Sequence, residues 1–233
     1  MRNFLRNSIL LVLVPLFLFG CGDILSGRNK DEIPLYGKGG VRSAREKKAD
    51  ALFVEEAIKE AGSGEAALKK YLKAGFGAFR YGDFKGAIKK FNQAWLIAPN
   101  NADVFWGFGN VLGAGGEIDE AIVMLKKAVE ISPSHYKAVA DLAYAYQQKS
   151  YRVAKSPEKK SYYLDLSDKT FVQANNINPG YELCYSNWAV TLYLQGRYKE
   201  SWDKIISARK LGGKSLDQKF IKDLSYVMPE PKK

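Results

Sequence analysis

The sequence contains very few of the side chains from which metal sites and catalytic centres are usually built. It has one histidine, His135, and two cysteines, Cys21 and Cys184, among 233 residues. A zinc site needs three or four ligands, mostly His and Cys, and His135 has no such residue near it. The acidic residues are scattered, and a pair such as Glu55-Glu56 is typical of a solvated helix face. We therefore predict a protein that is not an enzyme, with no catalytic residue, no metal and no cofactor.

Long apolar runs are scarce as well. The run ILLVLVPLFLF at residues 9–19 is shorter than the roughly 20 residues that a membrane-spanning helix needs, and a proline interrupts it. It follows Arg2 and Arg6 and comes just before a glycine. A basic start, a short apolar run and a small residue before the cleavage point are typical of a secretory signal peptide. We predict that residues 1–20 form such a signal, and a membrane-spanning helix is the alternative.

The residues at the end of this run, Leu18-Phe19-Gly20-Cys21, resemble the lipobox of bacterial lipoproteins. In that family the signal peptidase cuts before the cysteine, which carries acyl chains. The resemblance implies that Cys21 is lipidated, and two or more acyl chains anchor a protein stably to a membrane. The residue after the cysteine is Gly22 and not aspartate, which resembles the sorting signal that sends enteric lipoproteins to the outer membrane. The expected location is the bacterial cell envelope, with the chain anchored to the outer membrane and facing the periplasm.

A mature chain of residues 21–233 would still be strongly basic. Removing Arg2 and Arg6 from the 36 basic residues leaves a net charge of about +9 against 25 acidic ones. Inside a cell such a charge would favour nucleic acid. Outside the cytoplasm it favours an acidic protein face, anionic lipid or a polyanionic glycan, or it serves only solubility. We predict a protein or peptide partner and no nucleic acid. An acidic partner would complement the positive charge of this chain.

Lipidation of Cys21 would leave Cys184 as the one remaining thiol. A single thiol cannot form a disulfide within the chain. Because Cys184 lies in an apolar helical pattern, we predict that it is buried in the packing of the fold.

The region after the cysteine has two parts. Residues 21–41 carry glycine, proline and mixed charge without periodicity, and predict a flexible tether that spans about 25 Å. Residues 42–62 predict a charged helix with Leu52, Phe53, Ala57 and Ile58 along an apolar edge.

A sequence repeat with a period of 34 residues follows this helix. Ala87, Phe91, Ala94 and Pro99 recur as Ala121, Leu125, Ala128 and Pro133. Tyr71, Ala74, Gly75 and Ala78 recur likewise as Phe105, Phe108, Gly109 and Leu112. The period and the pattern resemble the tetratricopeptide repeat (TPR) family. The resemblance implies an all-α solenoid in which each repeat is a pair of antiparallel helices.

Two further repeats are degenerate, which makes about four in all over residues 68–213. The third contains an insertion near residues 150–161. Apolar residues spaced by three or four positions after the last repeat predict a capping helix over 214–228, as solenoids need at their ends. A loose tail at 229–233 completes the chain.

The glycine-rich stretch GFGNVLGAGG at residues 107–116 has some likeness to a phosphate-binding loop. Such a loop lies between a strand and a helix, whereas no strand pattern precedes Gly107 and no GK[ST] motif follows. The repeat instead places these glycines at the end of a helix and in the next turn. Gly107 and Gly113 would each cost a helix about 0.8–1 kcal/mol relative to alanine, so we expect close contacts that compensate.

In the TPR family the first helix of each repeat lines a concave groove. The resemblance implies a groove lined by Lys69, Lys73, Phe76, Phe79, Arg80, Asp103, Trp106, Asn110, Lys137, Tyr144, Gln147, Gln148, Ser186, Asn187 and Tyr193. Aromatic rings beside amides and cations suit an extended peptide. Packing against the N-terminal helix is the alternative for Phe76, Phe79 and Trp106. The carboxylate-clamp variant of the family is matched only at Lys137, so we do not expect binding of chaperone C-termini.

Two hypotheses follow. The first is a membrane-anchored, non-catalytic adaptor that binds an envelope protein or peptide in its groove, in the assembly or regulation of an envelope machine. The second is an enzyme or ligand carrier that uses the insertion near 150–161 as a lid.

Overall fold

The computed structural model describes residues 29–37 and 41–231. The predicted signal peptide, the lipidation site Cys21 and the start of the tether lie outside these residues. Every regular element within them is helical. They are η1 (Lys30–Glu32), η2 (Pro34–Tyr36), α1 (Ala44–Ala61), α2 (Gly64–Arg80), α3 (Phe84–Ile97), α4 (Ala102–Ala114), α5 (Ile118–Ile131), α6 (Tyr136–Arg152), α7 (Pro157–Ile177), α8 (Glu182–Leu194), α9 (Tyr198–Lys210) and α10 (Gln218–Val227). In the described part of the chain, none of these helices combines the length and the apolar character that crossing a membrane requires.

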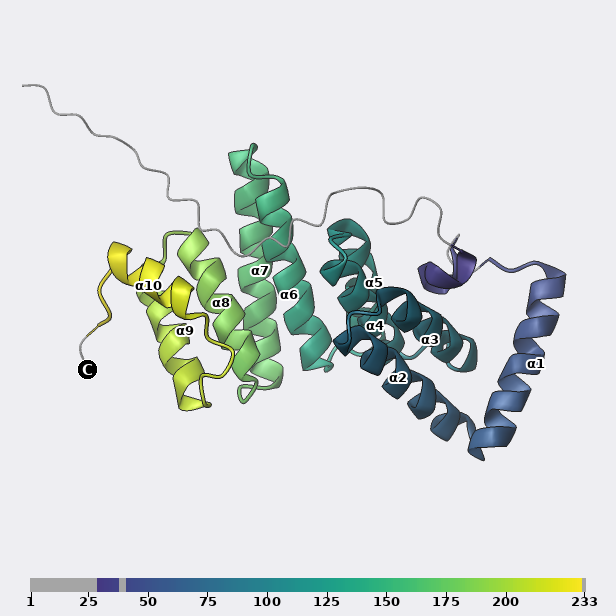
Figure 1. Cartoon of the computed structure of the whole chain (residues 1–233). Helices are drawn as coiled ribbons and strands as arrows, with labels where there is room; N and C mark the ends of the chain where they lie inside the picture. The colour runs from purple at the N-terminus through teal and green to yellow at the C-terminus, as the bar shows by residue number, and fades with distance from the viewer. Residues whose placement is uncertain (1–28, 38–40, 232–233) are drawn as a thin grey trace, which may run out of the picture.

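Four helical hairpins stack side by side to form a solenoid (Figure 1). They are α2–α3, α4–α5, α6–α7 and α8–α9, and the second helix of each hairpin packs against the first helix of the next. α1 lies at one end of the stack and α10 at the other. The predicted fold class is therefore confirmed: an all-α, TPR-like solenoid of four hairpins with a helix flanking each end.

Small residues let these helices approach one another closely. The ring of Phe91, which is fully buried, lies between Gly75 of α2 and Gly107 of α4. A Cβ atom would lie 2.6 Å from the ring at Gly75 and 2.5 Å from it at Gly107. Ala94 and Ala128 are fully buried between helices. The compensating contact expected at Gly107 is thus present.

The turns inside the hairpins also depend on glycine. Gly82, Gly116 and Gly196 each follow the first helix of a hairpin, with φ of 76°, 84° and 78°. This left-handed conformation is readily adopted only by glycine. The glycine-rich stretch at 107–116 is therefore a helix end and a turn, and the structure confirms that it is not a loop between a strand and a helix.

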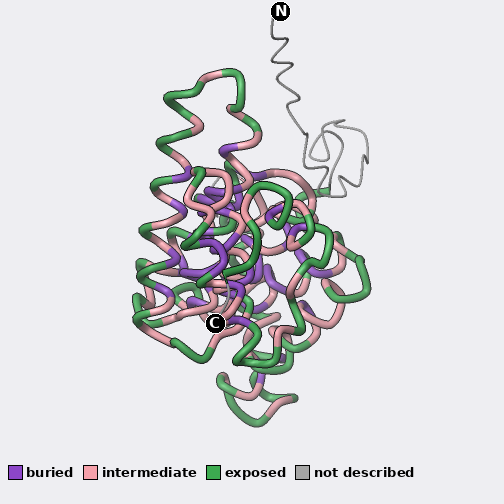
Figure 2. The backbone as a smooth tube through the Cα atoms, turned by 90° about the vertical axis from the view of Figure 1, so that its left-hand side faces the viewer, coloured by how far each residue is buried: buried purple, intermediate pink, exposed green. Residues whose placement is uncertain are grey.

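The insertion in the third repeat lengthens two helices and does not form a flexible loop. α6 has 17 residues and α7 has 21, against 13 and 14 in α4 and α5. Ser156 accepts a hydrogen bond from the Lys159 backbone and caps α7, and Pro157 occupies its first position. The lengthened hairpin projects beyond its neighbours (Figure 2). The inserted residues near 150–161 are therefore mostly helical and continue α6 and α7.

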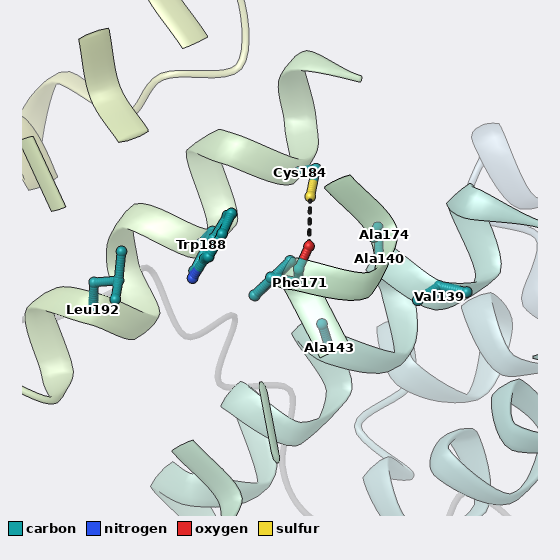
Figure 3. Packing of buried hydrophobic residues seen from close by; sticks show 8 residues of the cluster. All are labelled: Val139, Ala140, Ala143, Phe171, Ala174, Cys184, Trp188 and Leu192. Atoms are coloured by element: carbon teal, nitrogen blue, oxygen red, sulfur yellow. Dashed lines mark hydrogen bonds between the residues drawn. The ribbon is translucent and has the colours of Figure 1, made fainter. Parts of the chain in front are cut away.

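The third and fourth repeats share an apolar cluster in which Cys184 is buried (Figure 3). Phe171 and Trp188 stack with their ring centroids 6.4 Å apart. The Cys184 thiol donates to the Phe171 carbonyl at 3.7 Å. Burial raises the pKa of Cys184 to about 12, so its thiol stays protonated and unreactive. The prediction that this thiol serves packing is confirmed.

Residues 29–37, which the sequence assigned to the flexible tether, instead pack on α3, and we call them the docked segment. The fully buried Asn92 donates through Nδ2 to the carbonyls of Asp31 and Ile33 at 3.0 and 2.9 Å. Glu32 pairs with two lysines of α3 at 3.0 and 3.3 Å. The ring of Tyr36 lies 6.5 Å from that of Trp95. This part of the tether prediction is corrected, since backbone carbonyls anchored by a buried amide are held in place.

The flanking helices differ in how they join the solenoid. α1 packs on α2, where the rings of Phe53 and Tyr71 are 5.4 Å apart, and it leaves Leu52 exposed. α10 buries Phe220 and Leu224 against α8 and α9. These contacts complete the apolar faces of the first and last repeats.

Candidate partner-binding groove

The first helices of the four hairpins line one continuous face. α2 contacts α4, α4 contacts α6 and α6 contacts α8, whereas within the described residues successive second helices make no comparable contact. The solenoid therefore curves toward the face of α2, α4, α6 and α8, and this face is the concave one. The residues predicted to line a groove lie on these four helices.

A hollow of about 440 Å³ lies on this face between α2 and α4. Its lining residues are Lys73, Phe76, Phe79, Arg80, Trp106 and Asn110. All six were predicted as groove residues from the sequence. We call this feature the α2–α4 hollow.

The aromatic residues of the hollow pack mainly on one another and on the core. Phe76 lies between Phe91 and Trp106, with ring centroids 4.9 and 4.8 Å away. The ring of Phe79 lies 6.0 Å from that of Phe84. α1 makes its ring contact elsewhere, through Phe53. The alternative in which α1 packs against Phe76, Phe79 and Trp106 is not what the structure has, and all three rings stay partly exposed at the hollow.

Asp141 of α6 fixes the orientation of the Trp106 ring. The indole Nε1 donates to the Asp141 carboxylate at 2.6 Å. Asn110 donates to the Trp106 carbonyl at 3.0 Å, and its amide acts to lower the pKa of the Asp141 carboxylate. Burial raises the pKa of Asp141, and the indole and the amide oppose the shift. This role of Asp141 was not predicted from the sequence, although Trp106 and Asp141 lie about one repeat apart.

His135 contributes to the same cluster and is more than an exposed turn residue. Its Nδ1 accepts a hydrogen bond from the Ala138 backbone and caps α6 at 3.0 Å. Its Nε2 lies 2.9 Å from the Asp103 carboxylate and lowers the pKa of that group. The imidazole centroid is 5.1 Å from that of Trp106. Because Nδ1 accepts a hydrogen bond, the ring hydrogen lies on Nε2 and is donated to Asp103. His135 is therefore a structural cap beside the groove.

Cations without acidic partners surround the hollow. Lys69, Lys73 and Arg80 of α2 are exposed, and no ion pair involves them within the described part of the chain. Lys70, on another side of α2, pairs with Glu60 at 2.7 Å. Lys137 lies 5.7 Å from the Trp106 ring centre and forms no direct ion pair among the described residues, although its charge acts on Asp103 and Asp141. The hollow is therefore both aromatic and electropositive.

The other predicted groove residues do not line the hollow. Tyr144 of α6 is exposed, Gln148 is half-buried, and the Asn187 carbonyl accepts a hydrogen bond from Gln147 at 2.9 Å. Gln147 and Ser186 are buried, and Gln147 also donates to Thr191 at 2.8 Å. Gln147 thus joins α6 to α8, and the Ser186 hydroxyl hydrogen-bonds that of Ser215. The prediction that these two buried side chains line the groove is therefore wrong.

A second hollow, of about 660 Å³, lies where α7 faces the turn between α8 and α9. Its carboxylates have partners, whereas Lys160 and Lys169 form no ion pair within the described residues. Arg197 pairs with Asp168 and Glu200, each at 2.5 Å, and Asp168 also accepts from Trp188 at 2.6 Å. Across residues 29–37 and 41–231, no three His, Cys, Asp or Glu side chains lie close enough to hold a metal ion. This second hollow has the features of a polar surface between helices.

Comparison with known proteins supports the fold. No family model and no curated protein sequence matches the chain. A solved thermophilic TPR protein of Thermus thermophilus is similar in structure, with a TM-score of 0.63 and 19% identity over 70% of this chain and 84% of that one. Human IFIT1, solved as a dimer with PPP-AAAA, gives a TM-score of 0.54 and 16% identity over 75% of this chain and 38% of that one. An O-GlcNAc transferase mutant of Thermobaculum terrenum gives 0.50 and 20%, over 61% of this chain and 26% of that one. The chain thus has the fold of TPR proteins.

Proposed function

We propose that this chain is a non-catalytic adaptor of the bacterial cell envelope that binds an extended segment of a partner protein in its concave groove. A lipid on Cys21 would anchor it to the outer membrane, facing the periplasm. The observation that carries the binding proposal is the α2–α4 hollow, in which partly exposed rings stand beside cations that form no ion pair with the described residues.

The chemistry of the hollow supports a protein segment as the ligand. Aromatic and arginine side chains in pockets supply much of the binding energy of protein interfaces. The rings of Phe76, Phe79 and Trp106 offer apolar area, and Asn110 lies at the hollow's edge. The TPR-like scaffold provides a rigid surface for these groups, since they are carried by helices and not by loops.

An enzyme or a ligand carrier with the insertion as its lid is less well supported. The inserted residues extend α6 and α7 and leave only a short turn at residues 153–156. The likeness to the O-GlcNAc transferase covers about a quarter of that protein and concerns fold alone. We therefore prefer binding without catalysis.

Photo-cross-linking in the native cell tests the binding proposal. A photoreactive phenylalanine analogue replaces Lys73, which lines the hollow, or Val123, which is 59% exposed on the second helix α5. We expect Lys73 to give a discrete adduct with one protein and Val123 to give none. Adducts of equal yield and identity at both positions would refute groove binding.

Metabolic labelling tests the anchor separately. We expect the wild type to take up an alkyne-bearing palmitate and to sediment with membranes. Cys21→Ser should lose both properties, while Cys184→Ala, which removes the other thiol, should keep both. A wild-type protein without label would contradict the lipid anchor and leave the groove proposal standing.

A further inference from the structure

We infer that the α2–α4 hollow takes one bulky apolar side chain of an extended partner segment that carries acidic residues on both sides of that anchor. This inference deepens the proposed binding function and rests on it. It names the chemistry of the partner, which the presence of a groove alone does not.

The size and walls of the hollow suit one large side chain. Its volume of about 440 Å³ lies within the range of roughly 300–1,000 Å³ typical of binding pockets. Phe76, Phe79 and Trp106 supply three rings, and Asp141 holds the indole in one orientation. A preformed aromatic pocket binds an apolar anchor without the entropic cost of ordering its own walls.

The cations lie in one row along α2. Lys69, Lys73, Phe76 and Arg80 are spaced by four, three and four residues, so they share one face of the helix. At 1.5 Å per residue, Lys69 lies about 10 Å before Phe76 and Arg80 about 6 Å after it. An extended segment advances about 3.3 Å per residue. Carboxylates two or three positions from the anchor, on each side, would therefore reach the cations.

The acidic groups near the hollow do not oppose this assignment. The Asp141 carboxylate accepts a hydrogen bond from the indole of Trp106. Asp103 is occupied by His135. Lys69, Lys73 and Arg80 have no such partners within the described residues. Hydrogen bonds from neutral groups do not cancel the charges of these two carboxylates. The four cations Lys69, Lys73, Arg80 and Lys137 outnumber them, so the net charge around the hollow is positive and favours an acidic segment over a basic one.

Peptide binding to the purified full chain tests the inference. The probe is a fluorescent twelve-residue peptide with a central Trp and Asp at the second and third positions on both sides. Three matched peptides replace the Trp by Ala, the Asp residues by Asn, or the Asp residues by Lys. We expect the Trp- and Asp-containing probe peptide to bind. The Ala and Asn peptides should bind at least tenfold more weakly, and the Lys peptide should not bind.

Protein variants locate the binding. Lys73→Glu combined with Arg80→Glu should abolish binding of the acidic peptide, while Lys199→Glu, at an exposed lysine of α9, should leave it unchanged. Circular dichroism should show equal helicity in all variants. Binding that ignores the Trp, that survives the double variant, or that is matched by vesicles of phosphatidylglycerol would overturn the inference.

The two proposals can fail independently. If the photoreactive group at position 73 captures a partner segment without acidic residues beside an apolar anchor, the adaptor function stands and the inferred chemistry is wrong. If position 73 captures nothing and no peptide binds, both are wrong.

Discussion

Two glycines of α2, only two residues apart, should respond in opposite ways to substitution by alanine. A Cβ at Gly75 would lie 2.6 Å from the Phe91 ring, whereas a Cβ at Gly77 would meet nothing within 4 Å. Carbon atoms pack favourably at about 3.5–4.0 Å, so Gly75→Ala requires the ring to move by about 1 Å. Phe91 has no room to do so, because it is fully buried and Gly107 lies against it from α4.

The magnitude follows from the difference between these two variants. Both gain the same helix propensity, about 0.8–1 kcal/mol, and this term cancels in the comparison. The remaining difference is the cost of overpacking, about 1–3 kcal/mol. We expect Gly77→Ala to raise the unfolding free energy and Gly75→Ala to lower it. For a chain of this size, 1 kcal/mol corresponds to a shift of about 2–4 °C in melting temperature.

Thermal denaturation followed by circular dichroism at 222 nm measures both variants. A second pair repeats the test in α4, where Gly107→Ala presses on the same ring and Gly113→Ala meets Ala121 only at an ordinary 3.8 Å. Phe91→Leu should partly rescue Gly107→Ala, because the two sites share a contact and their effects are not additive. Equal melting temperatures within both pairs would refute the packing described for Phe91.

Three further predictions concern the anchoring and titrating groups. Asn92→Ala should free the docked segment, so hydrogen exchange in residues 29–37 should accelerate. Gln93→Ala, at a half-buried neighbour, should leave this exchange unchanged. Equal protection in both variants would contradict the role of the Asn92 hydrogen bonds. Burial raises the pKa of Asp141, so the folded state binds the proton of this carboxyl more tightly than the unfolded state does. The protonated group therefore contributes to stability below the ordinary Asp pKa of about 3.9. This contribution is lost as the pH rises through the raised pKa of the folded state. Asp141→Asn should flatten that part of a urea-denaturation profile measured against pH, and an unchanged profile would count against the assignment. Cys184, whose pKa burial raises to about 12, should react with a thiol reagent only after unfolding, and rapid labelling of the native protein would exclude its burial.

The repeats and the hollow could be predicted from the sequence because both depend on regular spacing. A period of 34 residues places Ala94 and Ala128 at equivalent helix contacts, and both are fully buried. The same register assigned Lys73, Phe76 and Trp106 to the first helices, where they meet in the hollow. Helical periodicity is local, so it survives degenerate repeats.

The contacts that the sequence did not reveal join residues without a shared period. Asn92 clamps carbonyls 59 and 61 positions earlier, in a segment whose composition resembles a linker. Trp106 and Asp141 are partners because neighbouring hairpins stack in one particular register. The insertion in the third repeat was visible as extra length, but only the structure showed that it continues α6 and α7 as capped helix.

The docked segment limits how far, and in which direction, a lipid on Cys21 would let the solenoid move. Eight residue steps separate Cys21 from Asn29, so this connection would reach at most about 26–29 Å. It would leave the molecule beside α3, a second helix, whereas the hollow lies on the concave face, on α2 and α4. The bilayer would then face the back of the solenoid, and the groove would open toward the periplasm. A partner segment close to the membrane would encounter the groove at a high local concentration. The groove itself would face away from the lipid headgroups.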